Sequence, residues 1–267
     1  MMAGTGSLDR TAALGSPGRG DRPPAAGGAA SADVDALRAD PAAWDAFVAS
    51  TPLAPYLQSS PWARTKTRNG WDPVRVVVPG TAGPVGGQVL VHRIGPTPWS
   101  IGYAPRGPVA AAVDADGVHA WTVAVREMAR RRRLSHVVVD PEIEAGGPEL
   151  EWFRAAGWHP AASPQPARSR WIDLARPEDE LWADLRGKWR QYVQKARRSG
   201  IAIVEGGAAT LPEFYAIYES TALRAGFNYR SEATYRAVYE AFAERDAARL
   251  LFARDPEGRA SSRRRAS

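Results

Sequence analysis

The order of strand-like and helix-like segments is the feature that most limits what this chain can fold into. Short runs that are β-branched or alternate polar and apolar residues predict strands at 74–78, 88–94, 100–104 and 136–140. Helical patterns run through Trp44 and Phe47, from Ser60 to Gly70, over 118–133 and over 149–156. Such alternation predicts a mixed α/β domain, with a hairpin between the first two strands and a buried strand at 136–140.

A second unit is predicted after the Pro-rich stretch 163–166. It starts with a strand at 170–174 and a helical segment at 181–201, followed by a strand at 201–205. Thr210 and Glu213 have the spacing of a capping box for the next helix. A helix at 231–245 and a strand at 249–254 complete the pattern.

The two ends of the chain have a different composition. Residues 1–32 are rich in Gly, Ala, Pro and Ser, so we expect them to be disordered. After Gly258 the sequence is basic and Ser-rich without a strand pattern, which a truncation or a frameshift would explain. The expected organisation is a disordered segment 1–32, a first domain 33–166, a partial second domain 167–258 and an unstructured tail 259–267.

The helical segment 181–201 combines an apolar stripe with a dense basic surface. No acidic residue lies between Arg186 and Arg198, so the cations there have no partner within the segment. Gly187 is placed to divide the segment into two helices. A solvated basic face is one interpretation; a surface that meets the phosphates of RNA, a nucleotide or a lipid headgroup is the other.

Composition excludes several classes of function. The chain has no cysteine, which removes disulfides, thiolate metal sites and cysteine nucleophiles, and its four histidines lack ligand spacing. Phosphate-binding glycine loops and the usual hydrolase and metalloprotease motifs are absent. No apolar run is long enough to span a membrane, and a cytoplasmic location is expected. These absences suit a reaction between an activated ester and an amine, which needs mainly positioning and charge stabilisation.

Several motifs, in a consistent order, resemble the FemABX family of tRNA-dependent aminoacyltransferases that build peptidoglycan cross-bridges. The motifs are Q-S-S-P-W-A-R-T-K at 58–66 with G-W at 70–71, Y-A-P-R-G-P-V at 103–109, I-D-L at 172–174, and K-x-R-x-Y-V-x-x-A-x-x-x-G-I at 188–201. The resemblance runs from about Tyr56 to Gly258.

The resemblance implies an α/β architecture with two acetyltransferase-like (GNAT-like) domains, each a mixed sheet with flanking helices, the second incomplete. It implies no metal and no cofactor. The donor would be aminoacyl-tRNA, and the acceptor the stem-peptide amine of a peptidoglycan precursor, either lipid II or UDP-MurNAc-pentapeptide. It also implies peripheral contact with the inner membrane face, and no DNA. Because central strands of the second domain are missing, we expect impaired activity.

Site residues carry over from the motifs of the family. Lys66 and Arg190 match positions that bind the phosphates of the precursor, and Arg offers a planar fork for that purpose. Tyr103, Arg106 and Tyr192 are the other expected substrate-binding residues, although Tyr103 and Arg106 also suit a purely structural turn. Contacts to tRNA phosphates are expected from Lys188, Lys195, Arg197 and Arg198. No catalytic residue is predicted.

The chain departs from the family pattern at two positions, and two other functions are open. Gln194 occupies a position that is often arginine in the family, and Tyr192 one that is usually asparagine. The first alternative is a non-catalytic basic protein that binds RNA or an anionic precursor. The second is an acyl-CoA N-acyltransferase, against which the missing CoA loop counts.

Overall fold

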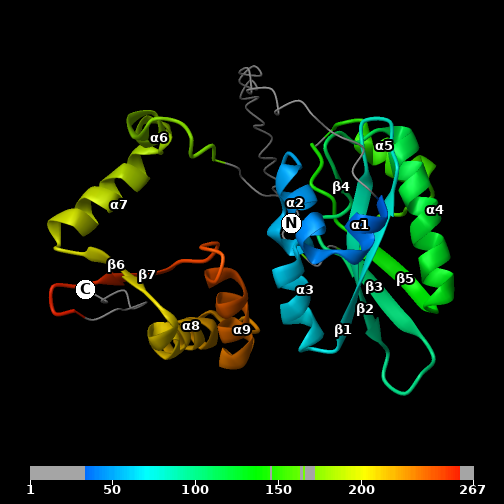
Figure 1. Cartoon of the computed structure of the whole chain (residues 1–267). Helices are drawn as coiled ribbons and strands as arrows, with labels where there is room; N and C mark the ends of the chain where they lie inside the picture. The colour runs from blue at the N-terminus through cyan, green and yellow to red at the C-terminus, as the bar shows by residue number, and fades with distance from the viewer. Residues whose placement is uncertain (1–33, 145, 163–164, 166–171, 259–267) are drawn as a thin grey trace, which may run out of the picture. The chain divides into compact units, whose positions relative to one another are not determined.

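The computed structural model describes residues 34–144, 146–162, 165 and 172–258 (Figure 1). Its larger sheet has five strands. In spatial order β1 (Trp71–Val78), β2 (Val85–Arg93), β3 (Ser100–Ala104) and β5 (Leu134–Val139) lie side by side, and the short β4 (Val109–Ala110) also pairs with β2. The first three strands are antiparallel, whereas β3 and β5 are parallel. The predicted mixed sheet and its first hairpin are confirmed.

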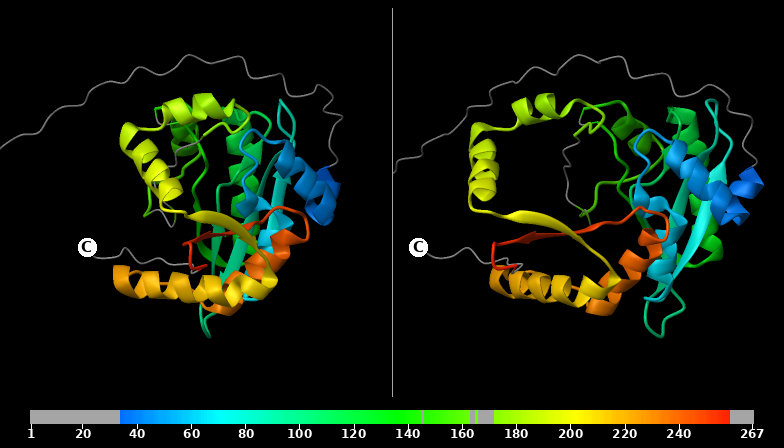
Figure 2. Two further views of the ribbon diagram at one scale, coloured as in Figure 1. Left: turned by 90° about the vertical axis from the view of Figure 1, so that its left-hand side faces the viewer. Right: turned by 60° about the vertical axis from the view of Figure 1, so that its left-hand side comes forward.

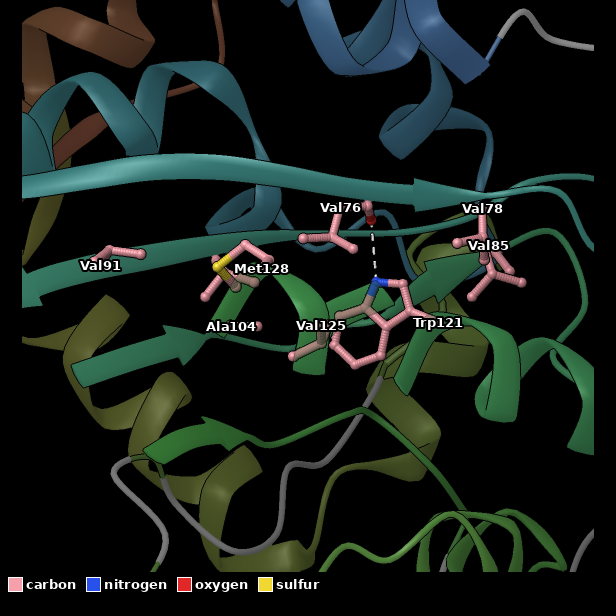
Figure 3. Packing of buried hydrophobic residues seen from close by; sticks show 10 residues of the cluster. Val76, Val78, Val85, Val91, Ala104, Trp121, Val125 and Met128 are labelled. Atoms are coloured by element: carbon pink, nitrogen blue, oxygen red, sulfur yellow. Dashed lines mark hydrogen bonds between the residues drawn. The ribbon is translucent and has the colours of Figure 1, made fainter. Parts of the chain in front are cut away.

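One face of this sheet is covered by α4 (Ala115–Arg131), and α5 (Glu149–Ala155) packs against α4. Trp121, Val125 and Met128 of α4 are buried against the valines of β1 and β2 (Figure 3). Close approach is possible because Gly87 has no side chain: a Cβ there would lie 2.6 Å from Cζ2 of Trp121.

Helices near the N-terminus cover the opposite face. Because side chains alternate along a strand, Val77 points away from α4 and packs with buried residues of α1 (Val34–Ala39) and α2 (Pro41–Ser50). A 3-10 turn, η1 (Tyr56–Gln58), leads into α3 (Ser60–Thr67).

Two of these helices begin where capping chemistry predicts. The carboxylate of Asp40 accepts hydrogen bonds from the amides of Ala42 and Ala43 at the start of α2. The hydroxyl of Ser59 accepts one from the amide of Trp62 at the start of α3.

The C-terminal part contains a two-stranded antiparallel sheet, β6 (Ala202–Gly206) with β7 (Leu250–Arg254). Between them in the sequence come η2 (Ala208–Thr210), α8 (Leu211–Ala225) and α9 (Glu232–Ala243). The two helices α8 and α9 can be followed by colour in Figure 2. Leu211, Leu250 and Phe252 form its small core. Ile203 and Leu251, on the other face of the ladder, are 66% and 60% exposed.

Three local predictions are wrong. The strand 136–140 is not buried: β5 is half-exposed, because it lies at the margin of the sheet among the described strands. Thr210 does not cap α8; its hydroxyl bonds within the Gly207 turn, and Glu213 pairs instead with Arg254. Residues 172–174 are irregular, while the rest of that predicted strand lies outside the described residues, as do segment 1–32 and tail 259–267.

The helical segment 181–201 does divide, as Gly187 predicts. It forms α6 (Glu178–Asp184) and α7 (Gly187–Arg198), with extended backbone at Leu185 and Arg186 between them. The division into domains at 166 remains a prediction. Within the described part of the chain, no helix is both long and apolar enough to cross a membrane.

Candidate functional site

The first group of predicted site residues lies where β3 and β5 end. The two strands are parallel, so their carboxyl ends meet at one edge of the sheet. The Tyr103 hydroxyl donates to Oδ2 of Asp140 at 3.1 Å, and the backbone amide of Arg106 donates to Oδ1 of the same carboxylate at 2.7 Å. Asp140 thus joins Tyr103 to the Arg106 turn. Sequence reasoning missed Asp140, although its position directly after an apolar strand was a usable signal.

A second carboxylate faces the guanidinium of Arg106. Nε of Arg106 lies 3.6 Å from Oε1 of Glu142, and their side chains are only 16% and 15% exposed. Burial raises the pKa of Glu142, with the positive charge of Arg106 opposing that rise. Arg106 also adopts φ +57°, a left-handed conformation that is costly for a residue with a side chain. Asp140 therefore holds the Arg106 backbone, and Glu142 pairs with its guanidinium.

A cavity of about 180 Å³ opens beside this pair. Arg106 and Glu142 line it together with Glu149 and Phe153. Oε2 of Glu142 and Oε2 of Glu149 are buried and have no hydrogen-bond partner among the described residues. The cavity is therefore lined by one guanidinium group and two carboxyl groups.

The turn that carries Arg106 is tied to the core by Gln58, which is fully buried. Strand β2 pairs with β4 at Gly86 and with β3 only from Leu90 onward, so Gln88 lies in a gap between the two. The side-chain amide of Gln58 fills this gap. Its oxygen accepts from the Gln88 amide at 2.6 Å, and its nitrogen donates to the Pro105 carbonyl at 2.6 Å.

Lys66 belongs to a separate group on α3. Its Nζ lies 4.3 Å from the ring centroid of Trp62, and the indole nitrogen of Trp62 is buried without a partner among the described residues. Burial lowers the pKa of Lys66, and the positive charge of Arg230 lowers it further. Trp62 and Trp71 are half-buried.

Arg190 is engaged with the end of the preceding helix. Its Nη1 donates to the carbonyl of Ala183 at 2.8 Å and, at a longer 3.4 Å, to that of Trp182. The Ala183 carbonyl belongs to the last turn of α6, whereas the Trp182 carbonyl already accepts from the Leu185 amide. No described contact joins Arg190 to Lys66.

The remaining predicted cations are spread over α7. Lys188 lies 5.7 Å from the ring of Tyr192, and Arg197 lies 5.6 Å from the ring of Trp182. Within the described part of the chain, none of the α7 cations has an ion-pair partner; they are Lys188, Arg190, Lys195, Arg197 and Arg198. Tyr192 is 46% exposed. The helix therefore displays uncompensated positive charge next to aromatic rings.

The environment of Tyr103 predicts a delayed ionisation. Burial raises its pKa from an ordinary 10 to about 12. We expect Tyr103→Phe to remove one tyrosinate that forms near pH 12, measured by absorbance at 295 nm. Because the pKa of the folded state lies above that of the unfolded state, stability is lost as pH rises from 10 to 12.

The Tyr103→Phe variant should therefore lose less stability than the parent chain over that window. The matched control is Tyr56→Phe, because the Tyr56 hydroxyl makes no hydrogen bond within the described residues. Loss of the late-titrating tyrosinate in the control instead of the variant would contradict this assignment.

The mixed α/β fold carries the predicted site residues in separate clusters, at the turn after β3, on α3 and on α7. The sequence profile of the FemAB family matches residues 40–146 and 157–254, so the chain belongs to the FemAB family. A lipid II:glycine glycyltransferase from Staphylococcus aureus (strain MRSA252) is 26% identical over 226 residues, covering 80% of this chain and 53% of the relative. The enzyme of the same name from S. aureus strain COL is 27% identical with the same coverage.

A solved structure supports the fold. The crystal structure of FemX superposes with a TM-score of 0.68 at 24% identity, covering 78% of this chain and 55% of that one. The predicted family and acetyltransferase-like fold are confirmed. The chain spans about half the length of the relatives that it matches.

Proposed function

We propose that this chain takes part in aminoacyl transfer from aminoacyl-tRNA to the stem-peptide amine of a peptidoglycan precursor. In that reaction the amine attacks the ester carbonyl carbon, a C–N bond forms, and the bond to the ribose oxygen of the tRNA breaks. Overall, the proton that the amine loses ends on the ribose oxygen of the tRNA. The ester already supplies the free energy, so the protein must bind and orient its two substrates.

The observation that carries this proposal is the state of Lys66. It is half-buried, its pKa is lowered by burial and by a second cation, and no carboxylate pairs with it among the described residues. A half-buried lysine that lacks an acidic partner and feels the positive charge of Arg230 suits an anion of high charge, such as a diphosphate. Membership of the FemAB family and similarity to lipid II:glycine glycyltransferases supply the substrate class.

In this proposal the other clusters have distinct tasks. Tyr103 and Arg106, held by Asp140, contact the acceptor at the turn after β3. Arg190 and Tyr192 bind the acceptor from α7. Lys188, Lys195, Arg197 and Arg198 bind the backbone of the tRNA, where contacts position the molecule without reading its sequence.

The test measures both binding and transfer with the chain as it stands. Purified protein is mixed with tRNA charged with radiolabelled amino acids and with lipid II or UDP-MurNAc-pentapeptide, and label on the precursor is scored. Each of Lys66→Ala and Arg190→Ala is expected to weaken precursor binding by about 10- to 100-fold, because each removes a charge-assisted contact of about 1.5–3 kcal/mol. Arg64→Ala, an exposed cation on the same helix as Lys66, should bind normally.

Unchanged precursor binding in both variants would refute the proposed acceptor site. Normal binding by the parent chain without any transfer would favour the non-catalytic binding protein over the transferase. A dependence of tRNA binding on salt does not separate the two, since both predict phosphate contacts.

A further inference from the structure

A basic and aromatic surface lies at one end of the larger sheet, opposite the carboxyl ends of β3 and β5 where Tyr103 and Arg106 lie. It consists of the loop between β2 and β3 and the C-terminal end of α4, which lie at the same end of the sheet (Figure 1). The amide of Ser100 donates to the carbonyl of Arg133 at 3.0 Å, which joins the two segments. We call this surface the arginine–tryptophan tip; its residues are Arg93, Ile94, Trp99, Arg130, Arg131, Arg132 and Arg133.

The apolar residues of the tip are exposed although the loop is well ordered by its own hydrogen bonds. Trp99 is 53% exposed and Ile94 is 40% exposed, whereas Trp44 and Trp121 are fully buried. The amide of Ile94 donates to the carbonyl of Trp99 at 2.9 Å, and the Thr97 hydroxyl donates to the carbonyl of Ile94 at 2.7 Å. The tight turn thus holds Trp99 at the surface in a defined position.

The arginines of the tip are poorly neutralised. Arg130 and Arg131 share the single carboxylate of Glu127 at 3.8 and 3.7 Å, and Arg132 pairs with Asp72. Arg133 has no ion pair within the described residues. Five arginines against two carboxylates leave a formal charge of +3 on this small surface.

We propose that the arginine–tryptophan tip docks on an anionic lipid membrane surface. Trp99 and Ile94 enter the headgroup region, where an amphipathic indole is favoured, and the arginines meet the lipid phosphates. An exposed aliphatic residue beside the indole favours lipid over RNA, because a nucleic acid offers rings to stack on but no apolar layer to enter. The family resemblance already implies contact with the inner membrane face, and the inference adds the surface that makes this contact. It goes beyond the proposed function, since docking requires neither acceptor binding nor transfer.

Vesicle co-sedimentation of the full chain tests this directly. Binding is compared on phosphatidylcholine vesicles with and without phosphatidylglycerol, and we expect binding only to the anionic vesicles, with a loss at high salt. The triple variant Arg130→Gln, Arg131→Gln, Arg133→Gln should bind at least tenfold more weakly, since each arginine near an anionic surface contributes roughly fivefold. Trp99→Ser should weaken binding on the order of tenfold.

Two control variants match these changes in chemistry but lie elsewhere. Trp189→Ser removes a similarly exposed indole from α7, and the triple variant Arg154→Gln, Arg224→Gln, Arg249→Gln removes the same charge from other exposed positions. Both should bind vesicles like the parent chain, and all variants should keep the parent circular dichroism.

Three outcomes would overturn the proposal. The first is failure of the parent chain to sediment with anionic vesicles. The second is an equal loss of vesicle binding in the control and tip variants, which would mean non-specific attraction of a basic protein. The third is a requirement for the tip arginines in binding an RNA oligonucleotide but not vesicles, with Trp99→Ser without effect, which would make the tip an RNA-binding surface.

Discussion

Replacing Trp121 with alanine is expected to lower the free energy of unfolding by about 3–5 kcal/mol, the range for deleting a large buried aromatic side chain. Trp121 is fully buried at the centre of the core between α4 and the sheet (Figure 3). Its indole nitrogen donates to the carbonyl of Val76 at 3.0 Å, and its ring stacks on Trp158 at 6.1 Å between centroids. The alanine variant would leave a cavity and would remove this hydrogen bond.

Urea denaturation followed by circular dichroism measures this loss. The control is Val123→Ala on the same helix, since Val123 is 51% exposed and its truncation should change stability by less than about 0.5 kcal/mol. A loss below about 1 kcal/mol for Trp121→Ala would show that neighbouring residues collapse into the space, contrary to the rigid packing over Gly87.

Gln58→Leu is expected to destabilise the chain by on the order of 3 kcal/mol, although leucine is apolar and of similar size. The substitution leaves the Gln88 amide and the Pro105 carbonyl unpaired, and each buried group without a partner costs about 1–3 kcal/mol. It also releases the turn that positions Arg106. We therefore expect weaker precursor binding in the folded fraction as well as lower stability.

Gln88→Leu provides the matched comparison. Gln88 is the same residue type and equally buried, but its side chain donates only one hydrogen bond, to the Ser59 carbonyl at 3.1 Å, and its oxygen has no partner among the described residues. Replacing Gln88 with leucine should lower the free energy of unfolding by less than replacing Gln58. An equal or larger loss for Gln88→Leu would contradict the role assigned here to the Gln58 amide.

Local sequence patterns predicted the elements well because they depend on short-range chemistry. Strand 100–104 has the predicted bounds, and Gly187 marks the division between α6 and α7. The capping box at Thr210 failed because a competing local bond, within the turn at Gly207, satisfied the hydroxyl first. The half-exposed state of β5 could not be predicted, since a run of valines looks the same at the centre and the margin of a sheet.

The candidate site was predicted only in part. Motif resemblance named Lys66, Tyr103 and Arg106, but not Asp140, which binds the last two. That carboxylate lies 34 residues beyond Arg106 in the sequence, and only the parallel pairing of β3 with β5 brings them together. The sequence also could not show that Arg190 is engaged with the carbonyl groups of α6.

What the sequence determined by itself is the family, most of the order of strands and helices, and the acid-free basic character of α7, because each follows from residue identity and spacing. Tertiary structure decided which polar groups meet. The amide of Gln58 replaces a missing strand beside Gln88, and Trp121 fits only where Gly87 leaves room. Both depend on contacts between distant segments, whose free energy is gained only when the sheet is assembled, so no local pattern encodes them.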